Sequence, residues 1–509
     1  MQINYNQKNE LELPIKRQLE ENIQAIESIF SEWGDLVKKK FVLQRADGNL
    51  DIFIFYIDGL TDNEMVERTI TRPLLYEWRG SEQKKGDAKA QLEEIFARQT
   101  EAVDISKKKT MMETIGCVLN GDTAMFIDGV DTALVLSTKK LPTRSIDSPK
   151  KEAGLKGPKD SFTENFRTNT ALLRRRVKDP KMKEKQSVLG QRSRTVYGLM
   201  YMEDLIQPSL LRRIEQKLNS FTIDGIYDSG MLVHLLEDKW YSPFPQIQTT
   251  ERPDKAASAI LEGRVVLVVD NSPEVIILPT TWNTFFQAAD DYYNRFAVAT
   301  FARVLRYLAA YITVLLPGLY IAITCYYPQV LPTNLLLAIA GARNDVTFPI
   351  VAEVLLMEML FELLREAGIR LPGQMGNTIG VVGGLIVGQA AVEASLVSTI
   401  VVIVVALTAI ASFAIPNEEF SSTFRLLKFL MIGLGAVWGL YGILLGMLVL
   451  QIHLASMESF GIPYMMPIVS GSIDDEVEYQ DFVMRKPFFT MRYRPLYTKK
   501  GNRIRFRRW

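Results

Sequence analysis

Long apolar runs fill one part of this 509-residue chain and are missing from the rest. Residues 1–295 are polar and rich in charge, whereas residues 296–470 hold apolar tracts with few charged side chains. A run of ~18 or more apolar residues is typical of a transmembrane helix, and none occurs before residue 296. The sequence therefore predicts an α/β soluble N-terminal module, an all-α membrane domain at 296–470 and a basic tail at 471–509.

Three apolar tracts predict about four membrane crossings. The first span is expected at about Val304–Tyr326. The tract 376–415 is too long for one crossing at ~1.5 Å per residue, so we interpret it as two spans joined by a tight turn near 393–395. The last span is expected at about Phe429–Ile452. Four crossings return the C-terminus to the side of the N-terminal module, where a basic tail fits the excess of Lys and Arg on cytoplasmic segments.

A charged apolar segment, Val346–Ala367, lies between the first two tracts. Because charged side chains are costly against lipid, we expect an amphipathic in-plane or re-entrant helix here. Its carboxylates Glu353, Glu358 and Glu362 are alternative candidates for an ion path. A local cluster of ion pairs on a solvated face explains them equally well.

Glycines recur at helical spacing in two of the apolar tracts. Small residues four apart let two helix backbones approach closely in lipid, and packing within one chain is favoured over a subunit interface. The predicted helix-packing residues are Gly376, Gly380, Gly384 and Gly388 in the long tract, and Gly435, Gly439, Gly442 and Gly446 in the last span.

One ionisable residue, Glu393, interrupts the 40-residue apolar tract, and Gln389 precedes it by one helical turn. The two share a helix face and can meet the same water-filled space. Rings of carboxylates favour cations, and apolar neighbours can gate a pore by dewetting. The candidate pore-lining residues are Gln389, Val392, Glu393, Leu396 and Val397. The alternative is that Glu393 is a turn residue among lipid headgroups.

The soluble module contains an internal duplication. Gly121–Thr138 aligns without a gap to Gly263–Thr280, and each copy reads strand, Asp turn, strand. Upstream, Phe55–Ile70 resembles Met200–Ile214 at a similar offset. We therefore predict two similar α/β subdomains, at about 17–140 and 185–285.

The remaining soluble segments are a short tail at 1–16 and a basic linker at 141–184. The linker contains Arg174-Arg175-Arg176, which is expected on a solvated helix face, with lipid headgroups or a neighbouring subunit as the alternative contact. The first 25 residues lack an apolar core of signal-peptide length, so the module is expected on the cytoplasmic side.

Several kinds of chemistry are not indicated. Two Cys and two His suit neither a disulfide scaffold nor a zinc site, and His234 in an apolar stretch fits a core histidine. There is no phosphate-binding G-x-x-x-x-G-K-[ST] loop and no G-x-S-x-G elbow. A net charge of +1 gives no global attraction to nucleic acid. We expect no enzyme, no cofactor and no nucleic-acid partner.

Seven strings resemble the GerA-type spore germination proteins, the A subunits of nutrient germinant receptors. They follow one another within residues 17–470: YIDGLTDNEMV, LNGDTAMFIDG, GPKDSFTENFRTNTALLRRRVKDP, TERPDKAASAILEGRVVLVVDNSP, LPGLYIAI, MEMLFELLREAGIRLP and SFGIPYMMP. The family also includes an A-subunit-like sporulation protein. The chain departs from the family at Asn271, where a glycine is common; Asn tolerates the same left-handed turn.

The resemblance implies a multi-pass protein of the spore inner membrane with its N-terminal module and tail in the spore core. It implies a homo-oligomeric ring, expected to be a pentamer, around an ion-conducting pore. The implied partners are a nutrient-binding membrane B subunit and a lipoprotein C subunit.

Three functions are compatible with these patterns: a nutrient-gated ion channel subunit, a secondary transporter, and a non-conducting scaffold. The transporter is disfavoured because the repeat lies in the soluble half and not in the spans.

Overall fold

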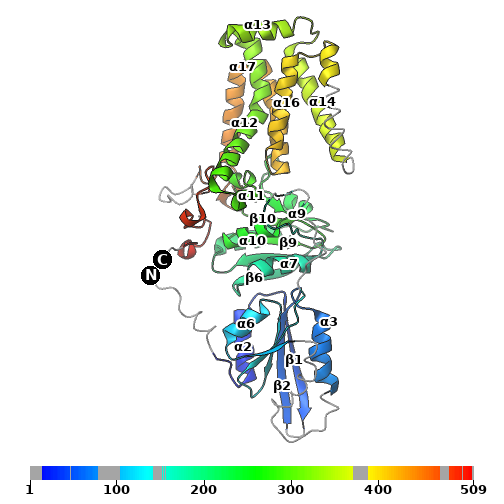
Figure 1. Ribbon diagram of the computed structural model, residues 1–509, viewed down its shortest axis with the longest axis vertical. Coiled ribbons are helices and arrows are strands. Elements are labelled where there is room, and N and C mark those ends of the chain that lie inside the picture. The colour runs from blue at the N-terminus through cyan, green and yellow to red at the C-terminus, as the bar shows by residue number, and fades with distance from the viewer. Residues whose placement is uncertain are drawn as a thin grey trace.

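The computed structural model describes residues 14–45, 48–77, 104–140, 149, 152, 154, 156–370, 384, 388–469, 481–495 and 497–506. Two α/β subdomains and a helical bundle follow one another along the long axis of the molecule (Figure 1). The second subdomain lies between the first subdomain and the helices.

The first subdomain is a five-stranded antiparallel sheet in the order β1-β2-β4-β5-β3, with helices on both faces. Alternate residues of β2 point to opposite faces, so Phe55 packs under α2 and α6 while Ile54 packs under α3 and η1. The elements are α2 (Leu19–Ile29), β1 (Leu36–Arg45), β2 (Gly48–Ile57), α3 (Asn63–Val66), η1 (Glu67–Thr71), η2 (Pro73–Glu77), β3 (Ile105–Lys108), α6 (Met111–Val118), β4 (Thr123–Ile127) and β5 (Ala133–Leu136).

The second subdomain repeats this plan, with its antiparallel sheet in the order β6-β7-β9-β10-β8. Helices α7 and α10 cover one face, and α8 and α9 cover the other. The elements are α7 (Phe166–Arg176), β6 (Met182–Leu189), β7 (Thr195–Met202), α8 (Pro208–Leu218), α9 (Ser229–Leu236), β8 (Gln248–Thr250), α10 (Pro253–Leu261), β9 (Val265–Val269) and β10 (Val275–Leu278).

Strand order and register confirm the predicted duplication. Phe55 pairs with Ala124 across β2 and β4, and Met200 pairs with Val266 across β7 and β9. The differences are 200 − 55 = 145 and 266 − 124 = 142, the same offsets that relate the two sequence repeats. One slip in register would turn every side chain to the other face, so the agreement fixes the whole core pattern.

Glycines at one turn are retained in both copies for a steric reason. Gly121 has φ +98° and Gly263 has φ +86°, and an added Cβ would lie 2.7 Å and 3.0 Å from the carbonyl oxygens of Leu60 and Leu205. Asn271 has φ 65°, so it adopts the left-handed turn expected of it.

The second subdomain begins earlier than the sequence suggested. Helix α7 lies in the stretch 141–184 that was expected to be a linker, yet it packs in the subdomain core. It is the counterpart of α2: the amide of Leu19 bonds to Asp128 Oδ1 at 3.1 Å, and the amide of Phe166 bonds to Asp270 Oδ1 at 3.2 Å. The basic composition of this stretch did not indicate a core helix, because Arg174 was expected on a solvated face and is in fact buried.

The helical part contains α12 (Phe296–Tyr326), α13 (Thr333–Ala342), α14 (Ile350–Arg370), α16 (Thr399–Phe413) and α17 (Glu418–Ala455). Of the described helices, α12 and α17 have the length and apolar composition of a membrane-crossing helix, although α17 is divided at Gly439. The expected first span therefore lies within one apolar helix. The described residues do not establish four crossings.

Helix α17 reverses its direction, which differs from the single last span expected at Phe429–Ile452. Gly439 has non-helical angles, φ 58° and ψ −138°. Thr423 bonds to the carbonyl of Pro243, and His453 lies 2.8 Å from the hydroxyl of Ser242. Thirty residues of straight helix would span about 45 Å, so two antiparallel limbs, 418–438 and 440–455, meet at Gly439.

The charged segment and the long tract also take defined positions. Helix α14 runs alongside α16, whereas the short helix α13 lies across the far end of the bundle (Figure 1). Helix α14 covers most of the charged segment Val346–Ala367, which was expected to be an amphipathic in-plane or re-entrant helix. In the long tract the chain turns at Ser395, with φ 55°, near the predicted turn. Gly376 and Gly380 lie outside the described residues.

The chain after the helices returns to the second subdomain. Strands β11 (Glu458–Ser459) and β12 (Ile462–Pro463) form a hairpin, and η6 (Phe488–Thr490) and η7 (Lys500–Asn502) follow in the tail. Thr498 donates to the carbonyl of Glu262 at 2.6 Å, and Arg494 donates to that of Leu261 at 2.8 Å. The described tail therefore lies on the same side of the helical bundle as the soluble module.

Candidate functional site

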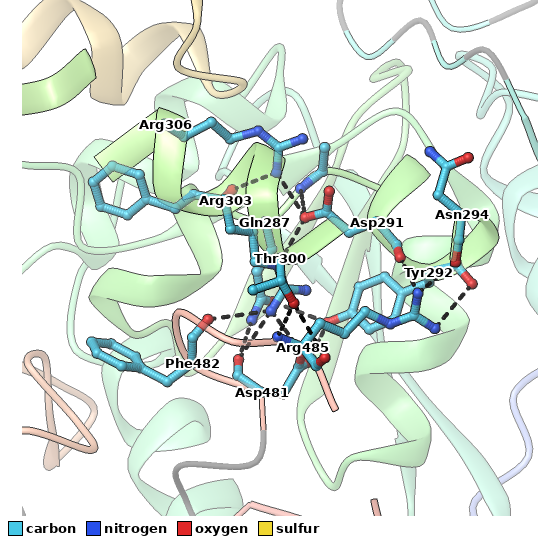
Figure 2. Close-up of polar contacts among 12 residues, drawn as sticks. Gln287, Asp291, Tyr292, Asn294, Thr300, Arg303, Arg306, Asp481, Phe482 and Arg485 are labelled. Atoms are coloured by element: carbon cyan, nitrogen blue, oxygen red, sulfur yellow. Dashed lines mark hydrogen bonds and ion pairs between the residues drawn. The ribbon is translucent and has the colours of Figure 1, made fainter. Parts of the chain in front are cut away.

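A buried ionic junction joins the second subdomain, the start of α12 and the tail (Figure 2). At its centre is Arg303, which is 0% exposed. Its Nε lies 3.0 Å from Asp291 Oδ2, and its Nη1 lies 2.7 Å from Asp481 Oδ1. Asp291 belongs to the short helix α11 (Asp290–Tyr293), which follows η3 (Trp282–Phe285) at the base of the subdomain. One side chain thus connects three parts of the chain.

Two further arginines complete the junction. Arg306, one turn along α12, lies 2.7 Å from Asp291 Oδ2. Arg485 is 3% exposed, and its guanidinium donates to the carbonyl of Asn294 at 2.8 Å, while its amide donates to Thr300 Oγ1 at 3.2 Å. These bonds hold Arg485 against the start of α12, where the chain leaves the subdomain.

Tyr292 connects α11 to the tail within the same junction. Its hydroxyl donates to Asp481 Oδ2 at 2.6 Å. Burial, and after it the charge of Asp481, raises the pKa of Tyr292 well above its ordinary value. The phenol therefore stays protonated and remains a donor to the carboxylate throughout the physiological range.

A second buried ionic cluster lies among the apolar helices. Lys428 of α17 is 2.6 Å from Glu358 Oε2 and 2.9 Å from Glu362 Oε1, both on α14. Arg425, one turn earlier, is 3.1 Å from Glu362 Oε2. Glu358 and Lys428 are both almost completely buried. Of the two interpretations of these carboxylates, the cluster of ion pairs describes their contacts, although the cluster is buried and not on a solvated face.

The third predicted carboxylate, Glu353, joins α14 to the start of α16. Its Oε2 accepts from the amide of Ser398 at 2.9 Å, and its Oε1 lies 3.2 Å from Arg343. Ser398 is the N-cap residue of α16, so Glu353 places negative charge at a helix N-terminus, where it is favourable.

The predicted pore-lining residues divide into two groups. Gln389 Nε2 donates to Glu393 Oε1 at 2.9 Å, and both side chains are exposed, as is Leu396. Val397 is 1% exposed and packs in the core between α14 and α16, with Val392 partly buried against the same core. In the single chain, therefore, Val397 faces the interior while the polar pair faces outward.

The glycines of α17 lie at close backbone contacts. An added Cβ on Gly435 would lie 2.7 Å from the carbonyl oxygen of Gly318 on α12. On the second limb, a Cβ on Gly442 would clash with the Leu434 carbonyl, and one on Gly446 would lie 2.6 Å from the Leu434 side chain. These contacts are within one chain. Among the described residues, a Cβ added at Gly384 would meet no atom within 4 Å, and one added at Gly388 would meet the side chain of Val402 at 3.7 Å.

A third ionic cluster holds the two soluble subdomains together, and sequence reasoning missed it. Arg174 of α7 makes a two-bond contact with Asp35 of the first subdomain, at 2.8 and 2.9 Å. Its guanidinium lies 3.4 Å from the centre of the Trp33 ring. Burial, followed by the charge of Asp35, raises the pKa of the neighbouring Glu184 well above its ordinary value. The sequence Arg174-Arg175-Arg176 does not by itself indicate which of the three arginines is buried.

The three ionic clusters connect separate elements of the fold. Among the described residues, no group of three or more His, Cys, Asp or Glu is placed to hold a metal ion. Buried ion pairs connect successive elements from the first subdomain to α14, and the exposed Gln389–Glu393 pair lies beyond them. The fold and sites define a class: a duplicated α/β module coupled to apolar helices through buried charges.

The family model described as "Bacillus/Clostridium GerA spore germination protein" matches residues 24–497. The chain belongs to this GerA family of spore germination proteins. It is 41% identical to "Spore germination protein A1" of Bacillus subtilis (strain 168), over 89% of this chain and 91% of that protein. It is 36% identical to "Spore germination protein GerLA" of Bacillus cereus, over 89% of this chain and 90% of that protein.

Two further similarities complete the comparison. "Stage V sporulation protein AF" of Bacillus subtilis (strain 168) is 32% identical over 82% of this chain and 83% of that protein. Among solved structures, the N-terminal domain of the A subunit of the Bacillus megaterium spore germinant receptor GerK3 is 24% identical, with a TM-score of 0.41, covering 52% of this chain and 96% of that chain. The resemblance inferred from the sequence motifs is thus confirmed at the level of the family.

Proposed function

We propose that this chain is the A subunit of a nutrient germinant receptor and forms an oligomeric cation channel that starts spore germination. Membership of the GerA family supports the role in germination. The proposed assembly is a pentamer in the spore inner membrane, with a nutrient-binding membrane B subunit and a lipoprotein C subunit as partners. The N-terminal module and the tail lie on the spore-core side.

The exposed pair Gln389–Glu393 carries the proposal of ion conduction. A carboxylate on an apolar helical surface is costly in lipid unless it meets water or a partner. Its hydrogen bond to Gln389 satisfies one oxygen and leaves the carboxylate facing outward. In a ring of subunits these carboxylates would face a common axis and attract cations. Leu396, also exposed, would provide an apolar constriction nearby.

A continuous series of buried contacts supports coupling of the module to this pair. Arg303 joins the second subdomain to α12, and α12 packs along α17 at Gly318 and Gly435. Lys428 joins α17 to α14 through Glu358, and α14 reaches the N-terminus of α16 through Glu353. Movement of the subdomain would therefore reach the turn that follows Glu393.

The test is conductance of the full chain, purified and reconstituted in a planar bilayer. We expect cation-selective currents from the wild type and reduced cation preference in Glu393→Gln. The matched control is Glu366→Gln, which removes an exposed carboxylate of α14 that is paired only locally, with Arg370 at 2.7 Å. The control should keep the wild-type selectivity.

Other outcomes would redirect the proposal. Assembled protein with no current in any condition would favour the scaffold. Uptake of labelled nutrient by vesicles that hold this chain alone would favour the transporter. Unchanged selectivity in a correctly assembled Glu393→Gln channel would remove this carboxylate from the conduction path.

A further inference from the structure

We propose that the tail segment Met484–Arg492 binds the anionic headgroups of the membrane leaflet next to the soluble module. The inference rests on the membrane placement given under the proposed function, and concerns a surface that the conduction path does not use. The segment is held at the base of α12, it exposes apolar side chains, and its exposed charges are positive.

Buried contacts fix both the position and the direction of the segment. Arg485 is held at the first turn of α12 by the carbonyl of Asn294 and the hydroxyl of Thr300 (Figure 2). Beyond it, Met491 is 6% exposed, and Arg494 is tied to the carbonyl of Leu261 in the second subdomain. The part between these anchors therefore cannot swing away from the end of the helix.

Between the anchors the segment exposes large apolar side chains. Met484 is 67% exposed, Phe488 50% and Phe489 55%. Clustered exposed apolar side chains of this size mark a surface that binds a partner or a membrane. Aromatic rings are enriched at the membrane–water interface, where the ring is buried and its edge remains near water.

The free charges of the segment are of one sign. Lys486 and Arg492 are exposed and have no ion pair in the part of the chain that the structure describes. Residues 482–506 contain no acidic side chain. Basic side chains next to a transmembrane helix are attracted to anionic lipid, and exposed apolar neighbours add to the attraction.

The neighbouring surface identifies the occupant as lipid. Thr300, which bonds to the backbone of Arg485, lies in the first turns of α12. Phe301, the next residue, is 65% exposed, and Val298 is 57% exposed. The segment therefore lies beside a helix that is long and apolar enough to enter a bilayer and that exposes apolar side chains in its first turns. A protein partner or a second copy remains as an outcome of the test.

The test uses spin labels on the full chain in vesicles, with the native cysteines replaced by Cys117→Ala and Cys325→Ser. Labels are placed by Phe489→Cys in the segment and by Met112→Cys in α6 of the first subdomain, an exposed apolar position at 53%. In vesicles that contain phosphatidylglycerol, oxygen should relax the label at 489 more than a water-soluble nickel complex does. The label at 112 should show the reverse.

Neutral side chains at the two basic positions provide the matched variant. Each basic residue near an anionic surface favours contact by about five-fold, so Lys486→Gln with Arg492→Gln should lower the equilibrium constant for lipid contact about 25-fold. Neither side chain makes a bond within the described residues that its loss would break. Vesicles of phosphatidylcholine alone, or 1 M salt, should act in the same direction because both remove the electrostatic attraction.

Two results would overturn the inference. A label at 489 that is open to the nickel complex in every vesicle means that water covers the segment. A label protected from both relaxing agents means that protein covers it. A third label, by Val437→Cys on the exposed side of α17, separates this inference from the proposed membrane placement. If that label also fails to meet oxygen in the bilayer, the placement itself is refuted; if it succeeds while 489 fails, only the tail inference is.

Discussion

Replacing Arg303 by methionine should release the tail from the base of α12. The guanidinium is completely buried and pairs with Asp291 and Asp481. Removing one partner of a buried pair costs about 3–5 kcal/mol, because the other charge is left uncompensated. Asp291 keeps its contact to Arg306 at 2.7 Å, and the side chain of Asp481 is 23% exposed. We therefore expect the lower end, about 3 kcal/mol.

Hydrogen exchange of the tail measures this change directly. Local opening governs the exchange of protected amides, and about 1.4 kcal/mol corresponds to a factor of ten. Amides of 481–495 should therefore exchange about 150-fold faster in Arg303→Met, while those of β7 and β9 keep their rates. A local measurement is needed because a chain with several subdomains does not unfold in two states.

Two control variants test whether the effect depends on the buried ion pairs of Arg303. Arg306→Met removes a partly exposed arginine and leaves the Arg303 pairs, so it should cost about 1 kcal/mol and raise exchange about five-fold. Arg192→Met removes an arginine with an 85% exposed side chain and should change nothing. If Arg303→Met and Arg306→Met had equal effects, the junction would not depend on the buried pairs, and the coupling argument would fail.

Three other outcomes follow from the structure. The pKa of Glu184 is raised in the folded protein, so its proton favours the folded state at low pH, and this contribution is lost as the pH rises through the folded-state pKa. Glu184→Gln removes the titrating group and should therefore make the thermal midpoint fall less steeply with rising pH. Gly121→Ala should lower the thermal midpoint, since its Cβ would lie 2.7 Å from a carbonyl oxygen, at a cost above ~1 kcal/mol, whereas Gly116→Ala, with open space around it, should not. Spin labels at Leu426 and Ile452, both exposed, should lie within about 20 Å of each other, because neighbouring helix axes are 8–10 Å apart; a straight helix would separate them by about 39 Å.

The duplication could be predicted from the sequence because its signal is local. A strand, a turn with left-handed backbone and a second strand each require particular residue types at fixed spacing. Two such units, Gly121–Thr138 and Gly263–Thr280, therefore align even after their other residues have diverged. The register of β4 and β9 is equivalent in the two copies.

The reversal in α17 could not be predicted from the same kind of signal. Glycines four apart are typical of close helix packing, and Gly435, Gly442 and Gly446 do lie at close contacts. Gly439 belongs to the same series, yet its positive φ turns the chain back. Periodicity reports which face a residue occupies and not whether the backbone remains helical there.

Buried charges were the other feature that sequence reasoning misjudged. Arg174 was interpreted as part of a solvated face, and Lys428 was not singled out. Each has a carboxylate partner on a distant segment, with Arg174 and Asp35 separated by 139 residues. A single sequence shows the cost of burying a charge, but only the fold shows which carboxylate offsets it.

The positions of these buried pairs bear on how the protein could switch. A buried ion pair that separates leaves two uncompensated charges, so arrangements between the paired and the fully separated state are costly. Arg174–Asp35, Arg303–Asp291 and Lys428–Glu358 each lie where one rigid element meets the next. Elements connected in this way favour a small number of discrete arrangements over continuous deformation. The proposed gated channel requires discrete closed and open arrangements, which is why these pairs, and not the exposed ones, are the contacts to perturb first.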